Sequence, residues 1–143
     1  MHVARDEIVE QLRAALLEHP VVLEAYLFGS AARGEAGPES DIDIAVYLDP
    51  GVEEPPMGHA AVLTTALMAA LHQDNIDLVT LNTAPPLLYH RVLRDGIRLV
   101  ARDVRATITR EGRALSRYCD YLPHLRKIDS VHAARIEAGD FGR

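Results

Sequence analysis

The sequence has little cysteine, no long apolar run and no excess of basic residues, and each absence narrows the classes of protein it can be. Cys119 is the only cysteine in 143 residues, which excludes an internal disulfide and a paired-cysteine zinc motif. No stretch approaches the roughly 20 apolar residues that span a bilayer, and the first residues include acidic side chains where a secretory leader would be apolar. We therefore expect a cytoplasmic protein.

The net charge of -6 argues against a protein whose main task is to bind nucleic acid, because neutralising phosphates requires clustered Lys and Arg. The charge is unevenly distributed. Residues 104–143 hold 8 Lys and Arg against 5 Asp and Glu, which leaves 7 against 16 in residues 1–103. An acidic body with a mildly basic C-terminal part indicates binding of divalent cations and of a basic protein partner. A solvated acidic surface without a ligand explains the same charge distribution equally well.

The hydrophobic pattern predicts one α/β domain with a small mixed sheet and helices packed on one face. With 48% hydrophobic and 25% charged residues, the chain is in the ordinary globular range. Apolar residues recur at helical spacing or in short β-prone runs. Helices are expected at residues 7–17, 60–71 and 87–94, and strands at residues 21–28, 41–48, 76–81 and 97–100. The first two strands are expected to be antiparallel, and beyond residue 103 the pattern is helical in two pieces broken around Pro123.

Two aspartates alternate with apolar residues in the second predicted strand. Successive side chains of a strand point to opposite faces, so Asp41 and Asp43 share one face while Ile42 points to the other. Neighbouring carboxylates repel each other, and a hard divalent cation such as Mg²⁺ turns that repulsion into coordination. Asp77 is an acid within another apolar strand, where an unpaired charge would be costly, and we expect it to lie beside the pair as a third carboxylate.

A glycine and a serine precede this strand in a turn that is suited to phosphate. Gly29 would let the backbone approach a ligand closely, and Ser30 stands where a helix N-cap would, with a hydroxyl and free backbone N–H groups. Arg33, one turn further on, could add a guanidinium, although an exposed arginine explains it equally well. Each part alone is common, but together they predict a two-metal site for phosphoryl or nucleotidyl transfer.

The residues just described resemble the signature of the DNA polymerase β nucleotidyltransferase superfamily. That signature is a Gly-Ser pair, here Gly29 and Ser30, followed after ten residues by the pair Asp41 and Asp43. Residues 32–34 are similar to the minimal nucleotidyltransferase branch of this superfamily. The resemblance implies that the two aspartates bind metal, that the Gly-Ser pair contacts phosphate, and that the third carboxylate of the family is Asp77.

The resemblance also suggests how the chain is organised, because it continues through residues 76–79 and 87–96 and so covers roughly residues 5–102. We expect a polymerase β-like nucleotidyltransferase domain in residues 1–102, with residues 103–143 as a C-terminal helical extension of the same domain. Forty residues hardly make a second domain for a small acceptor. The tail arginines are at largely helical spacing and either face a partner or form a solvated surface: Arg110, Arg113, Arg117 and Arg126.

Within the superfamily, the short chain is similar to the antitoxins of MNT/HEPN toxin–antitoxin pairs. This resemblance implies transfer of AMP from ATP, with Mg²⁺, to a tyrosine of a HEPN-type (HepT-like) ribonuclease toxin, and no direct contact with nucleic acid. Two alternatives remain open: a binding-only antitoxin with a vestigial nucleotide site, and a nucleotidyltransferase that acts on a small aminoglycoside-like acceptor.

Overall fold

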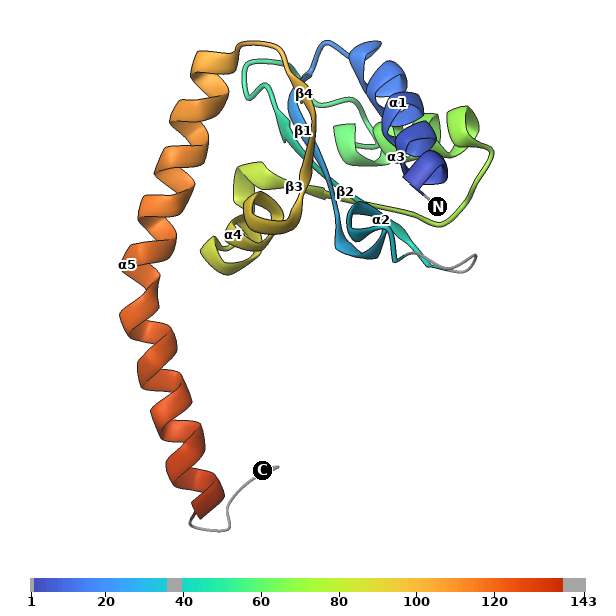
Figure 1. The fold of residues 1–143 in the computed structure, drawn as a ribbon. Helices are drawn as coiled ribbons and strands as arrows, with labels where there is room; N and C mark the ends of the chain where they lie inside the picture. The colour runs from blue at the N-terminus through green and yellow to red at the C-terminus, as the bar shows by residue number, and fades with distance from the viewer. Residues whose placement is uncertain (1, 36–39, 138–143) are drawn as a thin grey trace.

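The structure is a computed structural model that describes residues 2–35 and 40–137 of the chain, and the side chains of residues 5–35 and 40–127. Its elements follow one another as helices and strands of modest length, ending in one long helix (Figure 1). In chain order they are α1 (His2–Leu17), β1 (Val22–Phe28), α2 (Gly29–Arg33), β2 (Ile42–Leu48), α3 (His59–Leu71), β3 (Ile76–Thr80), the 3-10 helix η1 (Leu81–Thr83), α4 (Pro86–Asp95), β4 (Ile97–Ala101) and α5 (Val104–Glu137).

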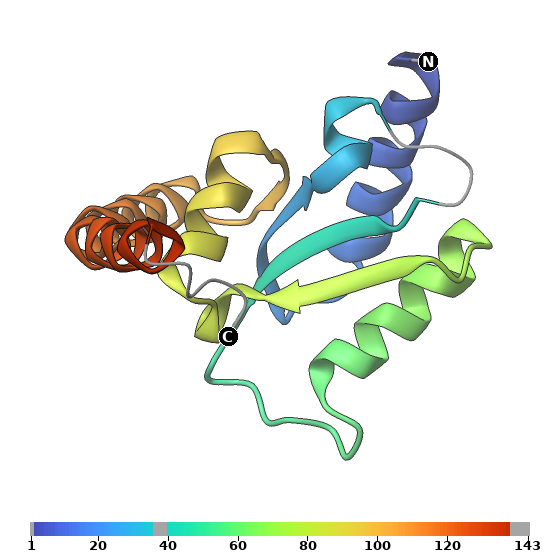
Figure 2. The same ribbon diagram turned by 90° about the horizontal axis from the view of Figure 1, so that it is seen from below.

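The four strands form one mixed sheet in the order β3-β2-β1-β4. β1 is antiparallel to both β2 and β4, which confirms the expected pairing of the first two strands. β2 and β3 are parallel, because α3 carries the chain back across the sheet between them (Figure 2). The mixed sheet and the α/β class predicted from the sequence are therefore confirmed.

One face of the sheet is covered by α1 and α3, which form the larger hydrophobic core. Alternation along β2 sends Ile42, Ile44 and Val46 to this face, where they meet Leu12 of α1 and Leu63 of α3. All five side chains are almost completely buried. Burying a side chain of this size contributes roughly 1.5–3 kcal/mol, so this layer supplies most of the stability of the domain.

The other face is partly covered as well, by α4 and the first turns of α5 (Figure 1). Tyr26 and Ala45 of the sheet pack there against Tyr89 and Val92 of α4 and Ala114 of α5. The expected packing of helices on one face therefore describes α1 and α3 only. α4 and α5 lie on the opposite face, because Val92 and Ala114 pack there against the sheet.

α5 is a single helix of 34 residues, and the expected break around Pro123 is wrong. Proline removes one backbone N–H donor and crowds the preceding turn, at a cost of about 3 kcal/mol in a helix interior. Pro123 is exposed, and the helical hydrogen bonds continue on both sides of it. The helix is about 51 Å long at 1.5 Å per residue, and its C-terminal half extends away from the sheet (Figure 1).

Buried polar contacts attach the first turns of α5 to the sheet. Glu24 of β1 is fully buried, and its carboxylate accepts a hydrogen bond from the guanidinium of Arg110. Next to this pair, Glu111 accepts hydrogen bonds from the Tyr26 hydroxyl and from Arg98, each at 2.7 Å. The position of α5 on the sheet is therefore fixed by specific pairs between residues that are far apart in the sequence.

None of the helices in the described ranges is both long enough and apolar enough to cross a membrane. The predicted division at residues 102 and 103 falls at the junction between β4 and α5, and residues 138–143 of the predicted extension lie outside the described part of the chain.

Candidate active site

The predicted metal-binding aspartates lie at the start of β2, and strand pairing brings a third carboxylate beside them. Asp43 is in register with Asp77 of the parallel strand β3 and with Phe28, the last residue of β1. Asp41 immediately precedes β2, which begins one residue later than expected. Asp41 and Asp77 are exposed, whereas Asp43 is half-buried between its neighbours. The structure thus brings together the three acids that the sequence singled out.

The pKa of Asp43 is shifted by burial and by the acids beside it. Burial raises the pKa of the Asp43 carboxyl above its ordinary value, and the negative charges of Asp77 and Asp41 raise it further. A hydrogen bond with Asp77 acts in the same direction, and only the positive charge of Arg33 opposes them. Ionised Asp43 is therefore in an unfavourable environment, which a divalent cation beside it would relieve.

The donor set at this place fits a hard cation, because it offers carboxylate oxygens and neither thiolate nor imidazole. Among the residues that the structure describes, no group of three or more His, Cys, Asp or Glu side chains has a geometry that could hold a metal ion. Asp41 and Asp77 are exposed, so their carboxylates are free to reorient around a cation, whereas Asp43 is held within β2. Metal binding by the three acids stays a prediction that this chemistry supports.

The turn that contains Gly29 is in direct contact with Asp43. Gly29 has a φ of 73°, in the left-handed region, and a Cβ atom built there would overlap Oδ2 of Asp43. α2 begins at Gly29 with Phe28 as its N-cap, so Ser30 lies inside the first turn and not at the N-cap position that was expected. The backbone N–H groups of a first helical turn have no partner within the helix. These donors and the carboxylates therefore lie side by side.

The family model described as polymerase beta, nucleotidyltransferase matches residues 10–105, about two thirds of the chain and all the residues of this site. The chain belongs to the polymerase β nucleotidyltransferase family. No significant match was found among curated protein sequences.

Solved structures that are similar to this nucleotidyltransferase include several toxin–antitoxin complexes. A crystal structure of a toxin–antitoxin with AMP-PNP is 27% identical, with a TM-score of 0.65, covering 89% of this chain and 97% of that chain. The MntA-HepT toxin–antitoxin is 26% identical, with a TM-score of 0.59, covering 92% and 98%. A tri-AMPylated Shewanella oneidensis HEPN toxin in complex with MNT antitoxin is 25% identical, with a TM-score of 0.59, covering 91% and 97%. The resemblance to MntA antitoxins that the sequence suggested is confirmed.

Arg33 lies within electrostatic reach of the carboxylates of this nucleotidyltransferase. Its side chain is exposed and donates a hydrogen bond to Glu35 at 3.0 Å. Its positive charge partly offsets the rise in the pKa of Asp43. It also adds to the lowering of the pKa of Asp95 in α4, which comes first from the hydrogen bond with Arg94. A phosphate placed between Gly29 and Asp43 would compete with Glu35 for this guanidinium, so phosphate contact by Arg33 remains a prediction.

The burial argument that singled out Asp77 applies in fact to another residue of this nucleotidyltransferase. Asp77 is exposed, so its charge is not taken out of water within its strand. The acid that is fully buried is Glu24, which is also flanked by apolar residues in its strand and carried the same signal in the sequence. Its partner, Arg110, lies 86 residues away, and no local pattern indicates that pairing.

Replacing Gly29 by Ala in this nucleotidyltransferase is expected to reduce transfer activity about a hundredfold, since displacing a catalytic group by 1 Å can cost that much. The new methyl group must push Asp43 out of position. Gly34→Ala is a matched control, because Gly34 also has a φ of 73° but a Cβ there meets nothing within 4 Å. Steady-state rates of both variants separate the two effects, and equal losses would show that backbone strain alone matters.

Proposed function

We propose that this chain is an antitoxin that transfers AMP from ATP to a tyrosine of a HEPN-type toxin and so neutralises it. The proposal is supported by family membership and by similarity to structures of a toxin–antitoxin with AMP-PNP and of an AMPylated HEPN toxin with its MNT antitoxin. The observation that carries it is the juxtaposition of Asp43 with Asp41, Asp77 and the Gly29 turn. We further propose that the protein acts in the cytoplasm without binding nucleic acid directly.

In the proposed reaction, the hydroxyl oxygen of the toxin tyrosine forms a bond to the α-phosphorus of ATP. The bond between that phosphorus and the bridging oxygen to the β-phosphate breaks, and pyrophosphate leaves. Two Mg²⁺ ions, when bound, supply Lewis-acid stabilisation of the charges on the attacking and leaving oxygens. Asp41, Asp43 and Asp77 would hold them.

The remaining tasks fall to residues of the chain itself. Asp77 is exposed at the edge of the carboxylate group, and so we assign it the acceptance of the tyrosine proton as the new bond forms. The first-turn N–H groups of α2, at Gly29 and Ser30, would donate to the phosphates, and Arg33 would add its positive charge. Asp77 and Arg33 are exposed and Gly29 and Ser30 are half-buried, so we expect a protein acceptor to reach them.

The experiment that tests this function measures the intact masses of the chain and of a cognate HEPN-type toxin after incubation with ATP and Mg²⁺. Each transferred AMP adds about 329 Da to the toxin, as expected for transfer of one nucleotidyl group. Asp41→Ala should abolish the added mass, whereas Asp74→Ala, which removes an exposed acid from the turn before β3, should not. Chelation of Mg²⁺ should have the same effect as Asp41→Ala.

The two alternative functions give different results in the same experiment. A toxin that gains no mass but is still bound and inhibited by Asp41→Ala would make the chain a binding-only antitoxin with a vestigial site. Transfer to an aminoglycoside in the absence of any protein partner would instead make it a small-molecule nucleotidyltransferase. Either result contradicts the proposed function.

A further inference from the structure

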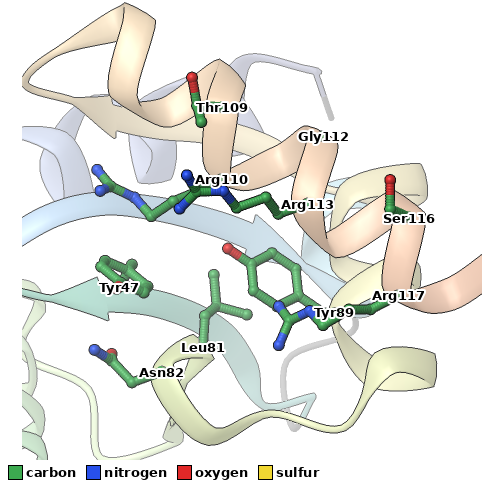
Figure 3. A pocket seen from close by; sticks show the side chains of 10 residues that line it. All are labelled: Tyr47, Leu81, Asn82, Tyr89, Thr109, Arg110, Gly112, Arg113, Ser116 and Arg117. Atoms are coloured by element: carbon green, nitrogen blue, oxygen red, sulfur yellow. The ribbon is translucent and has the colours of Figure 1, made fainter.

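A cavity of about 860 Å³ lies between the sheet and α5, on the same face as the carboxylates but away from them. Tyr47 of β2, Tyr89 of α4 and the arginines of α5 line it (Figure 3). Tyr47 follows Asp43 by four residues along β2, a separation of about 13 Å at 3.3 Å per residue. None of the proposed catalytic or phosphate-binding residues is part of its lining. The cavity is therefore a separate site.

The hydroxyl of Tyr89 has no hydrogen-bond partner, although the side chain is only 2% exposed. Figure 3 shows this hydroxyl directed toward the cavity, on the side of Tyr47 and Arg110. Burial and the charge of Glu24 raise the pKa of Tyr89 to about 12, so the group carries its proton at neutral pH and can donate it. A buried hydroxyl without a partner is uncommon in folded proteins and indicates that a ligand or water supplies the missing acceptor.

Three arginines of α5 line the cavity, and only one of them forms an ion pair with a described carboxylate. Arg110 is paired with the buried Glu24, and its guanidinium lies 4.6 Å from the centre of the Tyr47 ring. Arg117 lies 5.6 Å from the centre of the Tyr89 ring. Among the residues whose side chains the structure describes, neither Arg113 nor Arg117 forms an ion pair with a carboxylate. Two uncompensated positive charges, one helical turn apart, thus face a cavity with aromatic walls.

We propose that this cavity is a second ligand site that binds a nucleoside monophosphate. The phosphate, with a charge near -2, is neutralised by Arg113 and Arg117 and accepts the hydrogen bond of the Tyr89 hydroxyl. The base packs against the guanidinium of Arg110, which lies over the ring of Tyr47. The cavity volume is within the range of about 300–1,000 Å³ that small-molecule sites occupy, and nucleic-acid bases pack well on aromatic rings and on arginine guanidinium groups.

The site is tested by calorimetric titration of the full-length chain with AMP in the presence of EDTA. Chelation removes the cations on which the carboxylate site depends, so AMP binding that persists in EDTA and in the Asp43→Asn variant does not require those cations. Saturable binding of AMP is expected, with weaker binding of adenosine, which lacks the phosphate, and of inorganic phosphate, which lacks the base. No saturable binding of AMP would overturn the proposal, whatever the result of the transfer experiment.

Three variants connect the binding to the cavity. Arg117→Gln is expected to weaken AMP binding roughly tenfold to a hundredfold, as the loss of a charged hydrogen bond does. Arg105→Gln, which removes a charge from α5 outside the cavity, should leave it unchanged. Tyr89→Phe should weaken binding without lowering the melting temperature of the free protein, because its hydroxyl has no partner in the fold. Equal affinities of Arg117→Gln and Arg105→Gln would overturn the proposal.

Discussion

Asp43→Asn is expected to reduce AMP transfer about a thousandfold or more while leaving the melting temperature unchanged or higher. The loss corresponds to the upper end of what a single electrostatic contact contributes to catalysis. Stability should not fall, because burial and the charges of Asp77 and Asp41 raise the pKa of Asp43 in the folded protein. Folding therefore disfavours the ionised form of this carboxyl, and an uncharged side chain of the same shape removes that cost.

Two measurements check this prediction: the rate of AMP incorporation into the toxin, and thermal unfolding in EDTA. Asp74→Asn is the matched control, since Asp74 is an exposed acid next to β3 that takes no part in the proposed site. An Asp43→Asn protein that unfolds well below the parent would mean that the carboxylate is structural. A protein that retains activity would mean that Asp43 does not hold the cation. Either outcome is incompatible with the role assigned to this residue.

Arg110→Met is expected to destabilise the protein by about 3–5 kcal/mol, which is the cost of leaving a buried charge without its partner. Glu24 is fully buried on β1, and Arg110 donates the hydrogen bond that its carboxylate accepts. Its second oxygen has no partner, so no other group could compensate for the loss. Methionine keeps most of the apolar stem of the arginine, which confines the change to the charge.

Urea unfolding of the variant at neutral pH measures this cost. Arg113→Met is the matched control, since Arg113 is an exposed residue of α5 that pairs with no carboxylate among the described side chains, and its loss should change stability by less than about 0.5 kcal/mol. The double variant Glu24→Gln/Arg110→Met should recover part of the loss, because no charge is then left buried. Equal stabilities of Arg110→Met and Arg113→Met would show that the pair does not hold α5 on the sheet.

Much of this fold could be predicted from local patterns, because its strands are short apolar runs between clear turn residues. Each predicted strand overlaps an observed one, and the alternation around Asp41 and Asp43 correctly separated the core side of β2 from the acidic side. The acids and Gly29 were also identified from the sequence, because unusual residue types stand out within regular elements. Their proximity to Asp77 followed from strand pairing.

The parts that could not be predicted depend on contacts between distant segments. Nothing near Glu24 indicates that Arg110 will pair with it, and nothing near Tyr89 indicates the cavity beside it. Pro123 gave a local signal that was misleading. Proline usually ends a helix, but Pro123 lies inside α5, which continues beyond it. In each case the observed structure is stabilised by tertiary packing or by the many backbone hydrogen bonds of a long helix. Local residue propensities carry no information about either contribution.

The parallel pairing of β2 and β3 also has a consequence for the order in which the protein acquires activity. Asp41, Asp43 and the Gly29 turn lie on or between two antiparallel strands that are neighbours in the sequence, so their pairing is local and comparatively fast. Asp77 joins them only when the chain has crossed the sheet through α3, and such long-range pairing is intrinsically slower. A newly made chain is therefore expected to gain catalytic competence only after β3 is in place.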